Sequence, residues 1–364
     1  MKTARKWVLA LTAAAALAPL AGAQTTTPPP QTFTTTVYFD YSYNLTKDGY
    51  LTGTPAAQAL SNKFAFRRAY FTYENKISDF LKFRFRYDAD NTANITSVDF
   101  VKSSTKKDDK LRPFIKHVYL EWSPNFLQSK VNVGMIETIS FKLAEDRWGY
   151  RSVAKTLLDG YKDITGIEID QTSADLGATW KGTISKELRL GLGLHNGSHY
   201  SHIETDKFKK LSGFLQLVPV RGLSLVGFMD YEKQTDADKA VTYKADVYFD
   251  MIKNFNVSFE WFQYKNDTYK TKIDGVDKNY KIGGWSIFAT YKIKTDKLGI
   301  FARYDAYQPT SLDSTKDQSL IILGLDWFAW GSTGRLQPNV WIYNYKDSAR
   351  KTDIVFAMTF FLSF

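Results

Sequence analysis

The densest group of charged side chains lies in the segment 140–163, where polar and apolar residues do not alternate. Its charge is nearly balanced, because Lys142, Arg147, Arg151, Lys155 and Lys162 stand against Glu145, Asp146, Asp159 and Asp163. A second group lies in the run 80–89, which carries Lys82, Arg84 and Arg86. Clusters of fixed charge select ions, and Arg and Lys favour anions. We expect the two groups, with Tyr150, to face each other across a narrow aqueous space.

Three histidines suggest a second chemistry, metal binding. His195, His199 and His202 lie within the stretch HNGSHYSH, and neutral imidazoles are common metal ligands. However, closed zinc sites usually have four ligands, and the chain contains no cysteine. We therefore expect a polar loop without metal or other cofactor, with a metal site as the alternative.

Enzymatic chemistry finds little support in the sequence. It contains no GxSxG, HExxH, Walker or CxxC motif, although a catalytic site could exist on a sheet without such a signature. The net charge of +10 favours anionic solutes or lipopolysaccharide and does not by itself indicate nucleic acid. We expect no enzyme and no nucleic-acid partner.

Outside 139–165 the dominant pattern is a period of two, which is typical of strands with two different faces. In 80–89, for example, Leu81, Phe83 and Phe85 alternate with the cations. About sixteen such runs occur, an even number as in bacterial single-chain barrels. They lie near 34–43, 63–73, 80–89, 112–122, 130–138, 166–184, 188–197, 208–218, 222–232, 240–251, 255–265, 281–293, 298–308, 318–330, 335–346 and 353–364. We predict an all-β, antiparallel barrel, wide enough for an aqueous channel.

The connections and the ends of the chain agree with a barrel that crosses a membrane. Short turns alternate with longer polar connections such as 266–280 and 309–317, the arrangement of outer-membrane barrels. In 353–364 every second residue back from Phe364 is apolar, and a spanning strand needs about 9–11 residues. A soluble sandwich would instead bury the apolar faces in a core.

The first residues read as a secretory signal peptide, 1–23, with a basic start, an apolar run and a small-residue cleavage site. We expect a short lead-in, 24–32, and then the barrel, 33–364. On the second strand Arg67 and Arg68 are adjacent. One should face the lumen and the other outward unless a bulge intervenes, and an outward arginine would support an oligomer.

Two stretches resemble known families. A strand that ends the chain on phenylalanine resembles outer-membrane β-barrel proteins of Gram-negative-type bacteria, whose assembly machinery reads that pattern. The segment SFKLAEDRWGYRSVAKTLLDGY, 140–161, resembles the inward loop of the porin superfamily that contains the phosphate-selective porins O and P. The resemblance implies a third long connection that folds inward, with some helix, and a homotrimer. Phosphate selectivity is not carried over, because the basic ladders of the selective members cannot be aligned.

Together these observations predict a passive diffusion porin of the outer membrane for small hydrophilic solutes and ions, with weak anion preference. Residues 139–165 would narrow the pore. The expected surroundings are the lipid bilayer and lipopolysaccharide. Two alternatives remain: a channel specific for phosphate or sugars, with Tyr38, Tyr248 and Tyr264 placed inward as a sugar track, and a surface binding or adhesion protein anchored by the barrel.

Overall fold

The computed structural model describes residues 30–46, 62–90, 94–99, 104–108, 113–167, 169, 171–200, 202–273, 276–309 and 317–364. The predicted signal peptide and residues 24–29 of the lead-in lie outside these ranges. Residues Gln31–Phe364 form one compact unit, and its first strand begins at Gln31, two residues before the predicted start of the barrel.

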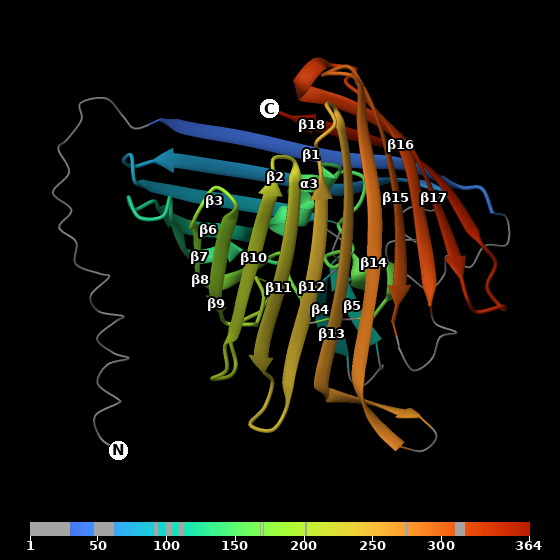
Figure 1. The fold of residues 1–364 in the computed structure, drawn as a ribbon. Helices are drawn as coiled ribbons and strands as arrows, with labels where there is room; N and C mark the ends of the chain where they lie inside the picture. Colours follow the sequence, from blue (N-terminus) through green and yellow to red (C-terminus); the bar gives the residue numbers. More distant parts are fainter. Residues whose placement is uncertain are drawn as a thin grey trace. The chain divides into compact units, whose positions relative to one another are not determined.

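The strands form a closed antiparallel barrel in which chain neighbours pair with each other and the last strand pairs with the first (Figure 1). This confirms the predicted fold. The sixteen strands of the barrel are β1 Gln31–Asn44, β2 Lys63–Lys76, β3 Leu81–Asp90, β6 Pro113–Trp122, β7 Lys130–Glu137, β8 Ala174–Thr183, β9 Leu188–His195, β10 Lys210–Val220, β11 Leu223–Lys233, β12 Lys239–Phe249, β13 Phe255–Ile273, β14 Val276–Lys294, β15 Leu298–Gln308, β16 Gln318–Trp327, β17 Gly334–Tyr345 and β18 Asp353–Ser363.

Two predicted boundaries are wrong, and the connection after β3 contains a hairpin that was not predicted. The strand expected from residue 166 begins only at Ala174, because 166–173 still belong to the inward connection. The predicted polar loop 266–280 is instead mostly strand, since the β13–β14 ladder resumes after a register shift and closes at Ile273 and Val276. Backbone pairing there does not depend on apolar side chains, so alternation gave no signal. Part of the charged connection after β3 forms a separate hairpin, β4 Asn94–Asp99 with β5 Ser104–Asp108.

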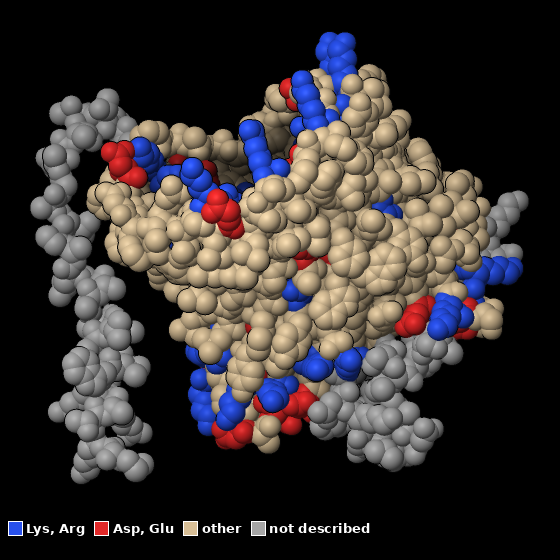
Figure 2. Space-filling model, in the orientation of Figure 1, with Lys and Arg blue, Asp and Glu red and all other residues tan. Residues whose placement is uncertain are grey.

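The outer surface of the barrel is apolar and the charged residues gather at its edges. On β12 the alternation is regular, since Tyr243 and Val247 are exposed while Lys244, Asp246 and Tyr248 are buried. Figure 2 shows a broad surface with few charges between two edges rich in Lys, Arg, Asp and Glu. The described helices include none that is both long and apolar enough to span a bilayer.

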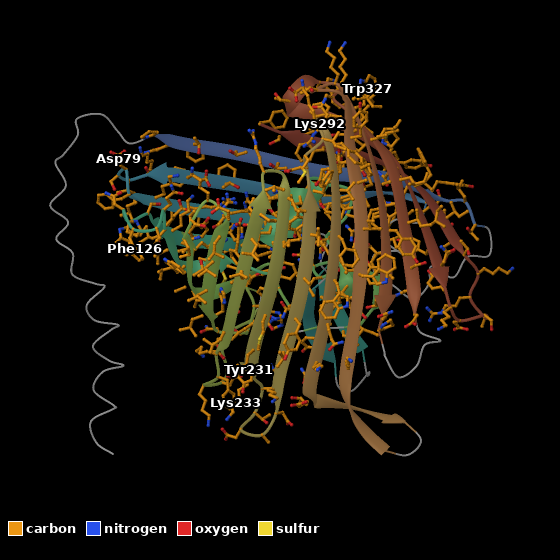
Figure 3. The ribbon with its side chains drawn as sticks, viewed as in Figure 1. Asp79, Phe126, Tyr231, Lys233, Lys292 and Trp327 are labelled. Atoms are coloured by element: carbon orange, nitrogen blue, oxygen red, sulfur yellow. The ribbon has the colours of Figure 1, made fainter. Side chains whose placement is uncertain are left out.

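Aromatic and charged side chains mark both edges of this apolar surface. At the edge with the short turns, Figure 3 labels Asp79, Phe126, Lys292 and Trp327, and Trp327 and Phe126 are both exposed. Tyr231 lies towards the opposite edge, beside the connection 234–238. Aromatic girdles around an apolar band are typical of barrels that lie in a membrane.

Gly134 is required where β7 lies close beside its neighbour β6, with Tyr119 directly opposite. Its φ is +132°, and a Cβ atom there would lie 2.3 Å from the carbonyl oxygen of Val118. Replacement of Gly134 by alanine is expected to destabilise the barrel by about 1–3 kcal/mol, the usual cost of a strained backbone residue. The matched control is Gly227→Ala, since a Cβ atom at Gly227 meets nothing within 4 Å. Urea unfolding in detergent compares the two variants, and equal midpoints would contradict the prediction.

Candidate functional site: the constriction inside the barrel

The connection between β7 and β8, residues 138–173, folds into the barrel and carries two short helices. These are α3 Lys142–Trp148 and α4 Tyr161–Thr165, and Figure 1 shows α3 behind the front strands. Near the short turns Arg147 pairs with Asp250, while on the other side Gln318 Nε2 donates to the Ile164 carbonyl at 3.3 Å. The predicted inward loop with helical character is confirmed, and it reaches across the interior.

One face of this inward loop forms a dry core with the inner side of the barrel. The wall side of the core comes from strands β12–β18, and both sides are apolar. Loop members are Phe141, Trp148, Tyr150, Val153, Ala154, Leu157, Leu158, Tyr161, Ile164 and Ile169, and wall members include Phe262, Tyr264, Ile282, Phe288, Phe301, Tyr307, Leu320, Ile322, Trp341 and Tyr343. Burial of apolar area is the main stabilising term in packing, so the loop is fixed to this half of the wall.

Aromatic side chains make the closest contacts in this core. The Trp148 ring lies edge-on to Phe288 and Phe301, with centroids 5.3 and 5.8 Å apart. Tyr161 meets Phe262 edge-on at 5.2 Å. Such edge-to-face pairs are favoured by the ring quadrupoles. The loop is therefore held in a defined orientation as well as by apolar burial.

Hydrogen bonds from wall arginines hold the loop backbone. Arg67 Nη1 donates to the carbonyl oxygens of Ser152 and Val153 at 2.7 and 2.9 Å. Arg303 Nη1 donates to the Lys155 carbonyl at 2.6 Å. Charged donors strengthen hydrogen bonds, and these bonds satisfy carbonyls in a segment with little helix.

A β-bulge places both Arg67 and Arg68 inside the barrel, which is the exception that the prediction of one outward arginine allowed for. Opposite β1, Arg68 pairs with Tyr38 whereas Phe66 pairs with Phe39, which leaves Arg67 as the extra residue. Arg67 contacts Asp40 at 3.1 Å. Arg68 contacts Asp90 at 3.0 Å. Because neither arginine faces outward, the pair gives no support for an oligomer.

The charges of the loop mostly pair with one another. Arg151 joins Glu145 at 3.5 Å to Asp159 at 2.9 Å, and Lys155 joins Asp163 at 2.8 Å. Lys142 pairs with Asp146 along α3. The field that the loop exerts on the opposite wall is therefore weaker than its charge count suggests.

The uncovered wall, formed by β2, β3, β6 and β7, carries the charges that face the loop. Arg84 contacts Glu74 at 3.0 Å and Glu137 at 4.0 Å. Arg86 instead donates to Thr72 Oγ1 at 2.8 Å and lies 4.7 Å from the Tyr70 ring centre. Within the described residues no carboxylate forms an ion pair with Arg86, so positive charge is in excess here.

Lys116 adds a cation to this wall that the alternation pattern did not reveal. Arg86 pairs with His117 and Tyr87 with Ile115, so Lys116 is the extra residue of a second bulge. Lys116 and His117 are both buried on the inner side. The signal in the sequence is the adjacent pair of polar residues within a strand, KH, which resembles the RR of the first bulge.

The pKa values of two carboxyls of the inward loop, Glu145 and Asp159, shift in opposite directions. Burial raises the pKa of Glu145, although Arg151 counteracts it. Burial also disfavours the charged form of Asp159, but Arg151, Lys155, Lys116 and Arg68 together lower its pKa below the usual range. Asp159 is therefore ionised at neutral pH, and Glu145 takes up a proton at a higher pH than an ordinary glutamate does.

Other predicted site residues lie near the short turns or in the apolar core. Lys82 is exposed near the short turns, 3.9 Å from Glu121. Asp146 and Arg147 line a cavity of about 350 Å³ near the same turns. Tyr150 is buried in the dry core, 4.3 Å from Phe301. Glu145, Arg151 and Lys155 thus remain as the loop members of the candidate constriction, with Arg84 and Arg86 on the wall.

The three tyrosines are buried, and two of the three histidines lie close together. Tyr38, Tyr248 and Tyr264 point inward, as predicted, but each is at most 3% exposed. A sugar could not stack on them without displacing their neighbours. His199 and His202 lie close, with ring centres 6.3 Å apart, and the described residues contain no group of three or more side chains placed to hold a metal.

Comparisons with known proteins identify the fold. No family model matches the chain, and no curated protein matches it. Solved structures do. An anion-selective porin from Comamonas acidovorans has a TM-score of 0.63 at 12% identity, over 92% of this chain and 99% of that one. OmpF of Salmonella typhi, in complex with daunomycin, has a TM-score of 0.61 at 12% identity, over 93% and 98%.

A third neighbour, the outer-membrane channel DcaP of Acinetobacter baumannii, has a TM-score of 0.59 at 11% identity, over 95% of this chain and all of that one. At such low identity the likeness establishes the architecture. This chain has the closed sixteen-stranded barrel of outer-membrane porins.

Proposed function

We propose that this protein is an outer-membrane channel through which small hydrophilic solutes and ions diffuse, with a weak preference for anions. The passage runs between the polar face of the inward loop and the uncovered wall of β2, β3, β6 and β7. An apolar band that circles a barrel is the surface expected against lipid, and so large an exposed apolar area is uncommon in soluble monomers.

The observation that carries the proposal is the asymmetry of the interior. Apolar packing fills the half along β12–β18, while cavities remain on both sides of the loop. One cavity of about 190 Å³ lies beside Lys116, and one of about 580 Å³ lies near Arg189 and Arg221 at the short turns. Cations dominate both, and lumenal Lys and Arg favour anions.

The test is the reversal potential of the purified protein in planar bilayers under a salt gradient. We expect stepwise conductance and a potential that reports modest anion preference. Clear cation selectivity would overturn the anion preference, and a protein that inserts without conducting would favour a surface binding protein. The readout should weaken at high salt, because salt screens exposed charges.

We further propose that the channel is a trimer that meets lipopolysaccharide and is inserted by the barrel-assembly machinery. One structural neighbour, OmpT of Vibrio cholerae folded in vitro, is described in a trimer form, with a TM-score of 0.56. Native mass spectrometry in a mild detergent measures the assembly directly, and a purely monomeric protein would count against it.

A further inference from the structure

A cavity of about 190 Å³ lies between the inward loop, the wall and the connection 196–209. Its wall side is formed by Arg68 and Lys116, and its loop side includes Arg151 and Asp159. Tyr200 closes it from the connection. Since a water molecule occupies about 30 Å³ in the liquid, the space suits a ligand of only a few non-hydrogen atoms.

Lys116 is the group in this cavity that lacks a partner at hydrogen-bonding distance. The side chain is 4% exposed. Its Nζ lies 3.8 Å from the nearest Asp88 oxygen and 3.8 Å from the centre of the Tyr200 ring, and hydrogen bonds of this kind are shorter than about 3.2 Å. Among the described residues this ammonium has an ion pair and a ring contact but no direct hydrogen bond, and a ligand in the cavity can supply that bond.

The remaining groups of the cavity restrict the ligand to a particular chemistry. Asp159 and Asp163 line it, and they pair with Arg151 at 2.9 Å and with Lys155 at 2.8 Å. These four charges largely cancel, which leaves Lys116 to bind a singly charged anionic group. The same two carboxylates accept hydrogen bonds, and Gln171, Thr172 and Ser173 add further polar groups. A matching ligand carries one negative group for Lys116 and several hydroxyl donors for the carboxylates.

We infer that this cavity binds a small hydroxycarboxylic acid, with its carboxylate on Lys116 and its hydroxyl groups on the Asp159 side. The inference deepens the proposed function, on which it rests, by naming the class of solute that binds at the constriction. The bulge at Lys116 is what makes the site, because a regular strand would not bring both Lys116 and His117 to the inner side.

Calorimetric titration of the purified full-length protein tests this inference with glycerate and three relatives that each lack one feature. Propionate keeps the charge without hydroxyl groups, glycerol keeps hydroxyl groups without charge, and phosphate is a compact oxyanion without carbon. We expect glycerate to bind about tenfold or more tightly than each of them, since a hydrogen bond to a charged group contributes that much. Tighter binding of phosphate, or no binding of glycerate, would overturn the inference.

Two variants separate the site from general electrostatics. Lys116→Gln should weaken glycerate about tenfold or more, whereas Lys130→Gln, which removes an exposed cation beside Glu121, should leave the affinity unchanged. Asp159→Asn keeps Lys116 and should weaken glycerate while strengthening phosphate. If Lys116→Gln does not fold, the opposite responses to Asp159→Asn still decide the matter, and parallel responses of both ligands would refute the site.

The bilayer recording distinguishes the failure of this inference from the failure of the proposed function. A protein that conducts with anion preference but does not bind glycerate is a channel without this site. A protein that binds glycerate but does not conduct has the site and is no channel.

Discussion

Replacement of Trp148 by alanine is expected to loosen the inward loop, raise the mean conductance and make the open-channel current noisy. Trp148 is fully buried, and its indole Nε1 donates to the Ala154 carbonyl at 2.9 Å. Arg303 also lies over its ring at 5.1 Å. Removal of a buried aromatic side chain costs about 3–5 kcal/mol, much of which here would come from the contact between loop and wall.

The matched control for this change is Trp327→Ala. Trp327 is 54% exposed at the edge of the barrel and is labelled there in Figure 3, so it makes no part of the interior. We expect that variant to conduct like the parent protein. Single-channel recording and thermal unfolding in detergent measure both effects, and a quiet, unchanged current from Trp148→Ala would contradict the fixed position of the loop.

The double replacement Arg84→Gln/Arg86→Gln should reduce the ratio of anion to cation permeability about fivefold. A unit charge about 8 Å from an ion in water changes its energy by about 0.5 kcal/mol, and screening at about 0.1 M salt reduces this to about 0.25 kcal/mol. Two such charges therefore favour an anion by about 0.5 kcal/mol and disfavour a cation by the same amount, which is about 1 kcal/mol in the ratio. The loss of Arg84 also removes this ion-pair partner from Glu74 and Glu137. Their negative charge then lowers the permeability ratio further. Reversal potentials under a salt gradient measure the ratio.

The control variant makes the same change in net charge as the double replacement, but at the edge of the barrel. Lys76→Gln/Lys130→Gln removes two exposed cations that pair with Asp79 and Glu121. Screening by salt makes charges at that distance from the constriction ineffective, so its selectivity should match the parent. Equal shifts in both double variants would show that net charge, rather than the wall, sets the preference.

Glu145 should give the selectivity a dependence on pH. Burial raises the pKa of its carboxyl, while Arg151 opposes the rise and Asp159 and Glu137 add to it. Acidification therefore neutralises this loop anion at a higher pH than an ordinary glutamate, and the anion preference should increase as the pH falls. In Glu145→Gln the preference should already be greater at neutral pH, with that part of the pH dependence absent.

Much of the barrel could be predicted because the alternation of apolar and polar residues within each strand identifies its two faces. In β12 the alternation of Tyr243 and Val247 with Lys244 and Asp246 is visible without knowledge of any partner. The inward connection was equally visible as a break in that alternation. Hydrogen-bonded ladders among polar residues, such as the end of the β13–β14 hairpin, carry no such local sign and were missed.

The interior was harder to predict because its main contacts join distant parts of the chain. Trp148 meets Phe288 and Phe301 across more than a hundred residues of sequence. Within a strand, the sequence does not distinguish inward phenylalanines such as these from phenylalanines that face outward. On the inner faces of β12–β18 the loop supplies the apolar partners, which the alternation along each single strand did not indicate.

The bulges at Arg67 and Lys116 bear on how such a protein can change during evolution. An extra residue in one strand brings a second side chain to the inner face, while the strand beyond it keeps its pairing with the neighbours. One inserted codon is thus enough to place a new ionic group on the part of the inner wall that the loop leaves uncovered, and its deletion restores the parent wall. The charge of the inner wall can therefore change by such single steps while the barrel keeps its strand pairing.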